Sequence, residues 1–248
     1  MMGEDFSSGN SLLHKLDART KLIVAACFSL QVAVQKTVEP TLCLLALALV
    51  FLLFSRLSPL AVGRRLLMVN TLTLFIWLTL PLQGGETIKF GPLALNREGI
   101  DLALLITIKT NTALLALMSL LSTSTPADLG HGLERLHLPE KLCFILLFAY
   151  RYIFVIHNEY KTLLRAAQMR CFTPKSSLHT YRTFAYLFGM TLVKSHNRAL
   201  RIHQAMVLRG FTGQLIPLKS GHINRTDTLF FCLASLAMTG ILAGQILL

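Results

Sequence analysis

The chain has 248 residues, of which 53% are hydrophobic and only 15% are charged, and its mean hydropathy is +0.58. This composition is too apolar for an ordinary soluble domain and indicates an integral membrane protein. The formal net charge of +12 is compatible with nucleic acid, an anionic membrane surface or acidic proteins as partners. The five cysteines stand singly without Cys-x-x-Cys spacing, so neither a disulfide framework nor a zinc site is indicated.

Residues 1–10 are polar and lack a basic region followed by an apolar core, so no cleavable signal peptide is predicted. Asp17 is placed to cap a helix that starts just before the first apolar run. Pro40 suits the first turn of a second helix. Five apolar runs predict membrane spans, which are residues 22–34, 40–54, 66–82, 100–121 and 229–248.

The charges of the loops predict the orientation of these spans. Residues 122–225 carry 14 Lys and Arg but only four acids, which places this block in the cytoplasm. The N-terminus and the loop with Arg56, Arg64 and Arg65 then lie inside as well. The nearly balanced loop 83–99 and the C-terminus lie outside. Three regions follow: a membrane domain 1–121, a cytoplasmic domain 122–226 and a C-terminal membrane helix 227–248.

Two further apolar stretches, 142–156 and 183–193, lie inside the basic block. If both crossed the membrane, the basic segment between them would lie outside and Arg151 would sit in the bilayer, at a cost of several kcal/mol. We therefore predict that they belong to cytoplasmic helices or graze the membrane surface. Prolines that start new helices predict three helices in the block, 126–137, 139–170 and 176–209.

The block contains one short repeat. Ala166–Thr173 and Ala205–Thr212 both read Ala-x-x-(Met or Leu)-Arg-x-Phe-Thr, and each stands where a long predicted helix ends. Arg170 and Arg209 thus occupy equivalent helix ends, which suggests two similar docking points. A chance match between two Ala-rich helix ends is the alternative.

Residues with catalytic potential are scarce. His131, Glu134 and His137 share a helix face, but a di-iron bundle needs this motif twice, so an exposed polar face is the simpler interpretation. No Walker-type loop, Gly-x-Ser-x-Gly or paired carboxylate occurs, so neither catalysis nor a cofactor is expected of this chain. Lys109 and Asn111 interrupt the fourth span. They either face a protein partner or a wet cavity, or Lys109 merely snorkels between helices.

Nucleic acid is a poor candidate partner, because the basic residues are dispersed along helices of a membrane protein and the positive-inside rule already accounts for them. The repeated arginine motif is not accounted for in this way. An arginine at a helix end can make forked contacts with acidic groups of a docked soluble protein.

Three motifs resemble a known family, the transmembrane T component of energy-coupling factor (ECF) transporters, a group of ABC importers. The first is Leu16-Asp17-Ala18-Arg19-Thr20-Lys21-Leu22, where the family usually has proline in the third position. The second is Thr125-Pro126-Ala127-Asp128-Leu129 followed by Leu136-His137-Leu138-Pro139. The third and most specific is Met206-Val207-Leu208-Arg209-Gly210-Phe211. The third motif and His14-Lys15-Leu16-Asp17 are most similar to the CbiQ-like cobalt or nickel branch.

The resemblance implies an all-α, L-shaped membrane protein with about five transmembrane helices and a cytoplasmic coupling domain of long helices. In that family, two Ala-Arg-Gly-like motifs end the coupling helices, and their arginines dock into two ATPase subunits. The corresponding positions here are Met169, Arg170, Cys171, Leu208, Arg209 and Gly210. Glycine is usual at the position of Cys171, so the tightness of the first docking turn is in question, and Arg209 is expected to dock more strongly.

The resemblance also implies the remaining partners and the location. A small metal-binding membrane protein, the S component, would carry cobalt or nickel ions, so no metal ligands are expected in this chain. The chain would span the inner membrane several times and transmit ATP-driven closure of the ATPases as a rigid-body motion. The rival hypothesis is a membrane-embedded enzyme for an anionic lipid or isoprenoid, with His131, Glu134 and His137 as its only candidate site. A lone channel or carrier is less favoured, since the sequence lacks inverted repeats.

Overall fold

The computed structural model describes residues 11, 13, 16–55, 57–80, 87–90, 93–136, 138–211, 213 and 225–247. Some residues used above lie outside the described part, namely residues 1–10, 83–86 and 214–224 and His14, Lys15, Arg56, His137 and Thr212. The chain forms two compact units. The first comprises Met1–Gly132 and Ser220–Leu248, and the second comprises Leu133–Lys219.

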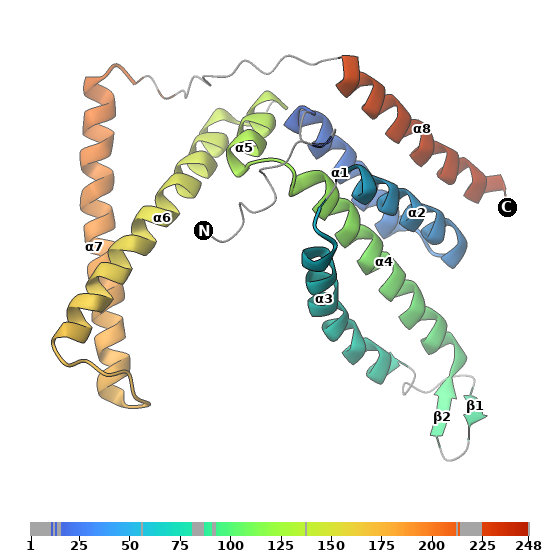
Figure 1. Cartoon of the computed structure of the whole chain (residues 1–248), viewed down its shortest axis with the longest axis horizontal. Helices are drawn as coiled ribbons and strands as arrows, with labels where there is room; N and C mark the ends of the chain where they lie inside the picture. Colours follow the sequence, from blue (N-terminus) through green and yellow to red (C-terminus); the bar gives the residue numbers. More distant parts are fainter. Residues whose placement is uncertain are drawn as a thin grey trace. The chain divides into compact units, whose positions relative to one another are not determined.

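The first unit is built from helices (Figure 1), three of which begin at a capping residue or with a proline in the first turn. Asp17 caps α1 (Ala18–Val34) by accepting a hydrogen bond from the Arg19 amide at 3.2 Å. A proline stands in the first turn of both α2 (Val38–Ser55) and α3 (Pro59–Thr79). The other helices of this unit are α4 (Arg97–Leu121), most of α5 (Pro126–Arg135) and α8 (Arg225–Leu247).

The core of this unit lies where α1, α2, α4 and α8 meet. Phe51 of α2 packs at its centre, with ring centroids 6.1 Å from Phe28 of α1 and 5.8 Å from Phe230 of α8. Leu44 and Leu120 of the same core are fully buried. By contrast, α3 packs mainly on α4 and leaves most of its large apolar side chains exposed, as a helix does when one side faces lipid.

One element of the first unit was not predicted. The loop 83–99 contains an antiparallel hairpin of β1 (Thr87–Phe90) and β2 (Leu93–Asn96), in which Phe90 pairs with Leu93. Helix α4 follows directly and begins at Arg97, three residues before the predicted span. All other regular elements among the described residues are α-helices, so the prediction of an all-α membrane protein is confirmed.

Five helices among the described residues are long and apolar enough to cross a membrane: α2, α3, α4, α6 and α8. Four of them coincide with predicted spans. The first predicted span corresponds to α1, which has 17 residues and is not among the five. The fifth is α6, which contains the stretch 142–156 that we predicted to remain in the cytoplasm or at the membrane surface. That location rests on the charge argument above and stays a prediction.

The second unit is dominated by two long antiparallel helices, α6 (Glu140–Met169) and α7 (Leu178–Leu208), which pack against each other (Figure 1). Pro139 precedes α6, and the Ser177 hydroxyl caps α7 by accepting from the Thr180 amide at 3.3 Å. The 30 residues of α6 correspond to a length of roughly 45 Å. The two ends of this hairpin are therefore far apart.

Candidate functional site

The first arginine motif forms a tight turn at the end of α6. Arg170 is the C-cap residue, and Cys171 follows with a left-handed φ of 62°. The Cys171 amide donates to the Gln168 carbonyl at 3.0 Å, and the Phe172 amide donates to the Ala167 carbonyl at 3.2 Å. This pair of bonds defines a Schellman motif, which satisfies carbonyls that the end of a helix otherwise leaves unpaired.

The second motif forms the same turn at the end of α7. Arg209 is the C-cap residue, and Gly210 follows with a φ of 78°. The Gly210 amide donates to the Val207 carbonyl at 3.0 Å, and the Phe211 amide donates to the Met206 carbonyl at 3.0 Å. The repeat found in the sequence is thus a repeat in backbone structure as well.

Cys171 does not prevent the first motif from forming the same turn as the second. Among the described residues, Cys171 is the only one other than glycine with a positive φ. A left-handed conformation costs an L-residue about 1–2 kcal/mol, because its Cβ crowds the following carbonyl. Gly210 avoids this cost. The two motifs therefore differ in strain and not in the shape of the turn.

Each turn presents its motif side chains to the outside. Met169 and Leu208, the residues before the two arginines, are 86% and 88% exposed. Arg170, Cys171, Arg209 and Gly210 are exposed as well. Large apolar side chains this exposed, each beside a cation, are typical of a surface that a partner covers. The structure therefore brings each predicted triplet together, one at each end of the helix hairpin.

The phenylalanine after each turn packs across the hairpin. Phe172, which follows α6, lies edge-on to Phe184 of α7 with centroids 5.6 Å apart. Phe211, which follows α7, packs on Phe144 of α6 at 5.4 Å. Each helix end is thereby fixed to the start of the other helix, so a force on either turn acts on both helices.

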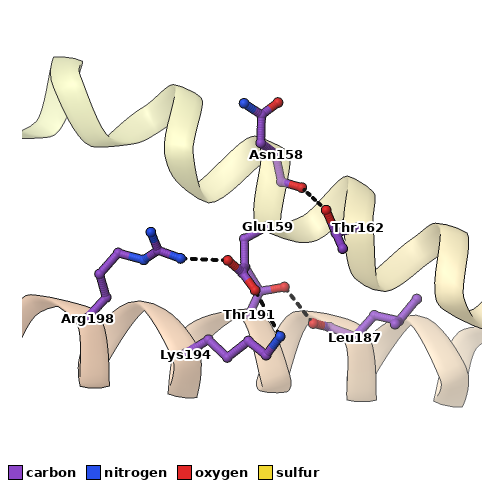
Figure 2. Close-up of polar contacts among 7 residues, drawn as sticks. All are labelled: Asn158, Glu159, Thr162, Leu187, Thr191, Lys194 and Arg198. Carbon is purple, nitrogen blue, oxygen red and sulfur yellow. Dashed lines mark hydrogen bonds and ion pairs between the residues drawn. The ribbon is translucent and has the colours of Figure 1, made fainter.

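A charged bridge joins the two helices between their ends (Figure 2). Glu159 of α6 accepts from Lys194 Nζ at 2.8 Å on one carboxylate oxygen and from Arg198 at 2.7 Å on the other, both residues being on α7. Tyr160 stacks on Phe188 next to this bridge, with centroids 5.1 Å apart. Sequence reasoning missed Glu159, although its signal was available: it is the only acid between residues 141 and 219.

The two polar residues of α4 are placed differently from each other. Lys109 Nζ donates to the carbonyl of Ala33, in the last turn of α1, at 3.1 Å. A lysine at a helix C-terminus is favourable because it meets unpaired carbonyls and the negative end of the helix dipole. The Asn111 Oδ1 atom is buried and has no partner within the described part of the chain. Contact of either residue with a partner protein stays a prediction.

The histidine motif on α5 does not form a site in the described residues. His131 and Glu134 lie on α5, and His137 is outside the described part of the chain. No group of three or more His, Cys, Asp or Glu side chains that could hold a metal ion occurs among the residues that the structure describes. The described side chains therefore offer no assembled centre for the rival enzyme hypothesis.

The long apolar helices of this chain define a multi-pass membrane protein. Comparison with known proteins identifies its kind. Residues 9–218 match the model of the CbiQ family, described as cobalt transport protein. The energy-coupling factor transporter transmembrane protein EcfT of Bacillus selenitireducens is 31% identical over 228 residues, which cover 83% of this chain and 81% of that protein.

Two further relatives agree with this result. The EcfT protein of Brevibacillus brevis is 27% identical over 218 residues, covering 83% of this chain and 82% of its own length. The nickel permease LarQ of Lactiplantibacillus plantarum is 34% identical over 89 residues, which are 36% of this chain and 32% of that protein. The chain belongs to the CbiQ family and is a transmembrane component of an ECF transporter. This family comprises membrane components of transporters and not enzymes, and no finding favours the enzyme hypothesis.

Proposed function

We propose that this chain couples ATP hydrolysis by two ATP-binding-cassette subunits to the import of cobalt or nickel ions by a metal-binding membrane partner, the S component. The observation that carries the proposal is the pair of matching Schellman turns, which present Arg170 and Arg209 at opposite ends of one helix hairpin. Two equivalent docking points, separated by roughly the 45 Å length of a 30-residue helix, suit two copies of one kind of partner.

The exposed side chains support a soluble protein as the occupant of each turn. A guanidinium group can bind a carboxylate through two parallel hydrogen bonds, while the adjacent Met169 or Leu208 fills an apolar recess of the partner. The phenylalanines Phe172 and Phe211 then transmit movement of a docked subunit to both helices. The packed hairpin moves as a rigid body, and this motion drives the membrane helices.

An apolar face of helix α6 supports the proposal of a membrane partner. Its exposed apolar side chains recur at helical spacing along one face, which comprises Leu142, Ile145, Leu146, Ile153 and Ile156. Such a stripe is stable only when lipid or another apolar surface covers it. We assign it to the S component, at the cytoplasmic side of the inner membrane, with the N-terminus of this chain also cytoplasmic. The names of the relatives support cobalt or nickel as the transported ion.

Charge reversal at the two turns tests the docking step. Arg170→Glu and Arg209→Glu should each reduce co-purification of the ATPases in detergent, because a desolvated ion pair that loses one partner costs about 3–5 kcal/mol. The double variant should lose the ATPases altogether and retain the S component. The matched control is Lys161→Glu, at an exposed lysine of α6 nine residues before Arg170, which should retain both partners. Full retention of the ATPases by the double variant would refute the proposal.

Charge placed on the apolar stripe separates the two partners. Ile153→Lys should weaken binding of the S component and leave the ATPases bound, because the change lies far from both turns. Uptake of nickel or cobalt ions into proteoliposomes that contain the complete complex, with ATP supplied on the ATPase side, then tests the substrate. A complex that assembles and hydrolyses ATP but accumulates neither ion would show that the metal assignment is wrong.

A further inference from the structure

The first turn of α1 carries a lysine that the docking mechanism leaves without a role. Lys21 is only 1% exposed, although lysine is almost never fully buried without partners. Its Nζ atom donates to the hydroxyl oxygens of Thr123 at 3.2 Å and Ser124 at 2.8 Å, just after the end of α4. This residue belongs to the motif Leu16–Leu22 that the sequence analysis singled out.

The N-terminus of α1 is also hydrogen-bonded to the start of α8. The Asp17 amide donates to the Asp227 carboxylate at 3.0 Å, across 210 positions of sequence. Asp227 is itself only 2% exposed. Asp17, Asp128 and Asp227 all lie close enough to Lys21 to attract its charge. A buried cation with three carboxylates around it links the beginnings of α1 and α8 to the end of α4.

Helix α5 also packs against the first turn of α1. A Cβ atom at Gly132 would lie 3.1 Å from the Ala18 Cβ and 3.3 Å from Leu22 Cδ1, so a larger residue would push α5 and the first turn of α1 apart by a few tenths of an ångström. Asp128 lies in the first turn of the same helix, where its amide donates to the Thr125 hydroxyl at 3.1 Å and its carboxylate accepts from that hydroxyl at 2.6 Å. Four helices, α1, α4, α5 and α8, thus meet around Lys21.

The position of this cluster along the chain gives it significance. The polypeptide leaves the first unit after Gly132 and returns to it at Ser220. Lys21 and Asp17 bind Thr123, Ser124 and Asp227. These three residues lie within nine residues of the two covalent connections between the units. A movement carried through either connection reaches the membrane helices at this cluster.

We propose that Lys21 is a positioning residue for transport, whose buried charge fastens both attachment points of the coupling hairpin to the first turn of α1. This inference rests on the proposed function for its role in transport. The geometry of the cluster stands independently of the transported ion. Buried ion clusters often add little to stability but fix one arrangement of the chain, because a slipped arrangement would leave the charges unpaired. Without Lys21, the hairpin would still bind ATPases but would move the membrane helices less.

The decisive variant is Lys21→Met, which keeps the length of the side chain and removes the charge. Thr123 retains its own bond to the Leu120 carbonyl at 2.9 Å, so its hydroxyl donor is not orphaned. In the purified complete complex, co-purification of the ATPases and their basal hydrolysis should equal those of the wild type. Amide hydrogen exchange in residues 123–130 and 225–232 should become at least about tenfold faster. Uptake of nickel or cobalt ions per ATP hydrolysed should fall about tenfold.

Two comparisons make the result specific. Lys21→Arg, which keeps the charge and the donors, should restore much of the uptake per ATP, and Lys36→Met, at an exposed lysine after α1, should change neither readout. Asp227→Asn keeps an oxygen for the Asp17 amide and removes the charge, so it should reproduce the Lys21→Met effects even if that variant fails to accumulate. Wild-type exchange rates and uptake per ATP in either charge-removing variant would overturn the inference.

The exchange readout also keeps this inference separate from the proposed function. If wild-type complexes take up neither metal but Lys21→Met still accelerates exchange at both attachment points, the assigned substrate is wrong and the fastening role of Lys21 stands. If uptake occurs and is unchanged in Lys21→Met, the proposed function stands and the role of Lys21 is wrong.

Discussion

Cys171 and Gly210 occupy the same left-handed position in two matching helix-ending turns, with φ angles of 62° and 78°. Only one of them is a residue that adopts this conformation without strain. The hydrogen bonds of both turns are nevertheless equivalent. The bonds and the phenylalanine packing of the first turn must therefore compensate for the strain at Cys171. We expect this compensation to be measurable, since replacing a single residue removes the strain.

Cys171→Gly should stabilise the protein by about 1 kcal/mol, because glycine adopts the left-handed region at little cost. Thermal unfolding in detergent measures the effect. Gly210→Ala is the matched reverse change. A Cβ atom at Gly210 would have no neighbour within 4 Å, so its expected loss of about 1 kcal/mol comes from the backbone conformation alone. Equal stability of Cys171→Gly and the wild type would mean that the first turn is relaxed.

The bridge from Glu159 to Lys194 and Arg198 should contribute little to stability, since its cations are 41% and 40% exposed. Glu159→Lys should cost more than Glu159→Gln, because a third cation would then face the other two. The extra loss should shrink at about 1 M salt, where the Debye length falls to about 3 Å. Unfolding measured in low and high salt checks this expectation, with Lys161→Met on the exposed side of α6 as the control. A loss independent of salt would indicate altered packing in place of electrostatics.

The close approach of α5 to α1 predicts a steric effect at Gly132. Gly132→Leu should destabilise the protein by about 1–3 kcal/mol, because the added side chain meets the Ala18 Cβ, whose position is fixed by the α1 backbone. Gly63→Leu is the control, since a Cβ atom at that glycine of α3 would have nothing within 4 Å. Both leucines favour the helix equally, so thermal unfolding separates the clash from helix propensity. Equal effects of the two substitutions would contradict this packing.

The sequence predicted much of the fold because its signals are local. Helix starts are indicated by prolines such as Pro40 and Pro139, and the end of α7 is indicated by an arginine followed by a glycine. Each of these signals, like the apolar runs, concerns only one or two turns of helix, and the observed helices agree with them closely. The hairpin β1–β2 was missed because its strands are only four residues each. The arginine motifs were found because they repeat in the sequence.

Contacts between distant parts of the chain could not be predicted in this way. The bond between Asp17 and Asp227 joins residues 210 positions apart, and no local pattern pairs them. Lys21 belongs to a motif that was recognised in the sequence. The residues next to it in the sequence do not indicate that four helices bury it. Glu159 carried a signal, since it is the only acid between residues 141 and 219, yet its partners on α7 depend on how two helices of about 30 residues pack together.

The burial of Lys21 also predicts a dependence on pH. Lys21 precedes the apolar run of α1, and burial lowers its pKa from 10.5 to about 8 against the opposing attraction of Asp128, Asp227 and Asp17. A lysine whose pKa is lower in the folded state destabilises that state while it stays charged. The cost is fully present below pH 8 and disappears as the pH rises towards 10.5, because the unfolded chain binds the extra proton in that window. The shift corresponds to about 3 kcal/mol at most.

The free energy of unfolding of the wild type should therefore rise relative to that of Lys21→Met between pH 8 and pH 10.5, as the wild-type lysine becomes neutral in the folded state. Other groups titrate in this range, but they contribute equally to both proteins and cancel in the difference between the two free energies of unfolding. Lys36→Met, at an exposed lysine, should differ from the wild type by a constant amount over the same range. A constant difference for Lys21→Met as well would mean that the buried lysine keeps its ordinary pKa, and that its three carboxylates fully compensate for its burial.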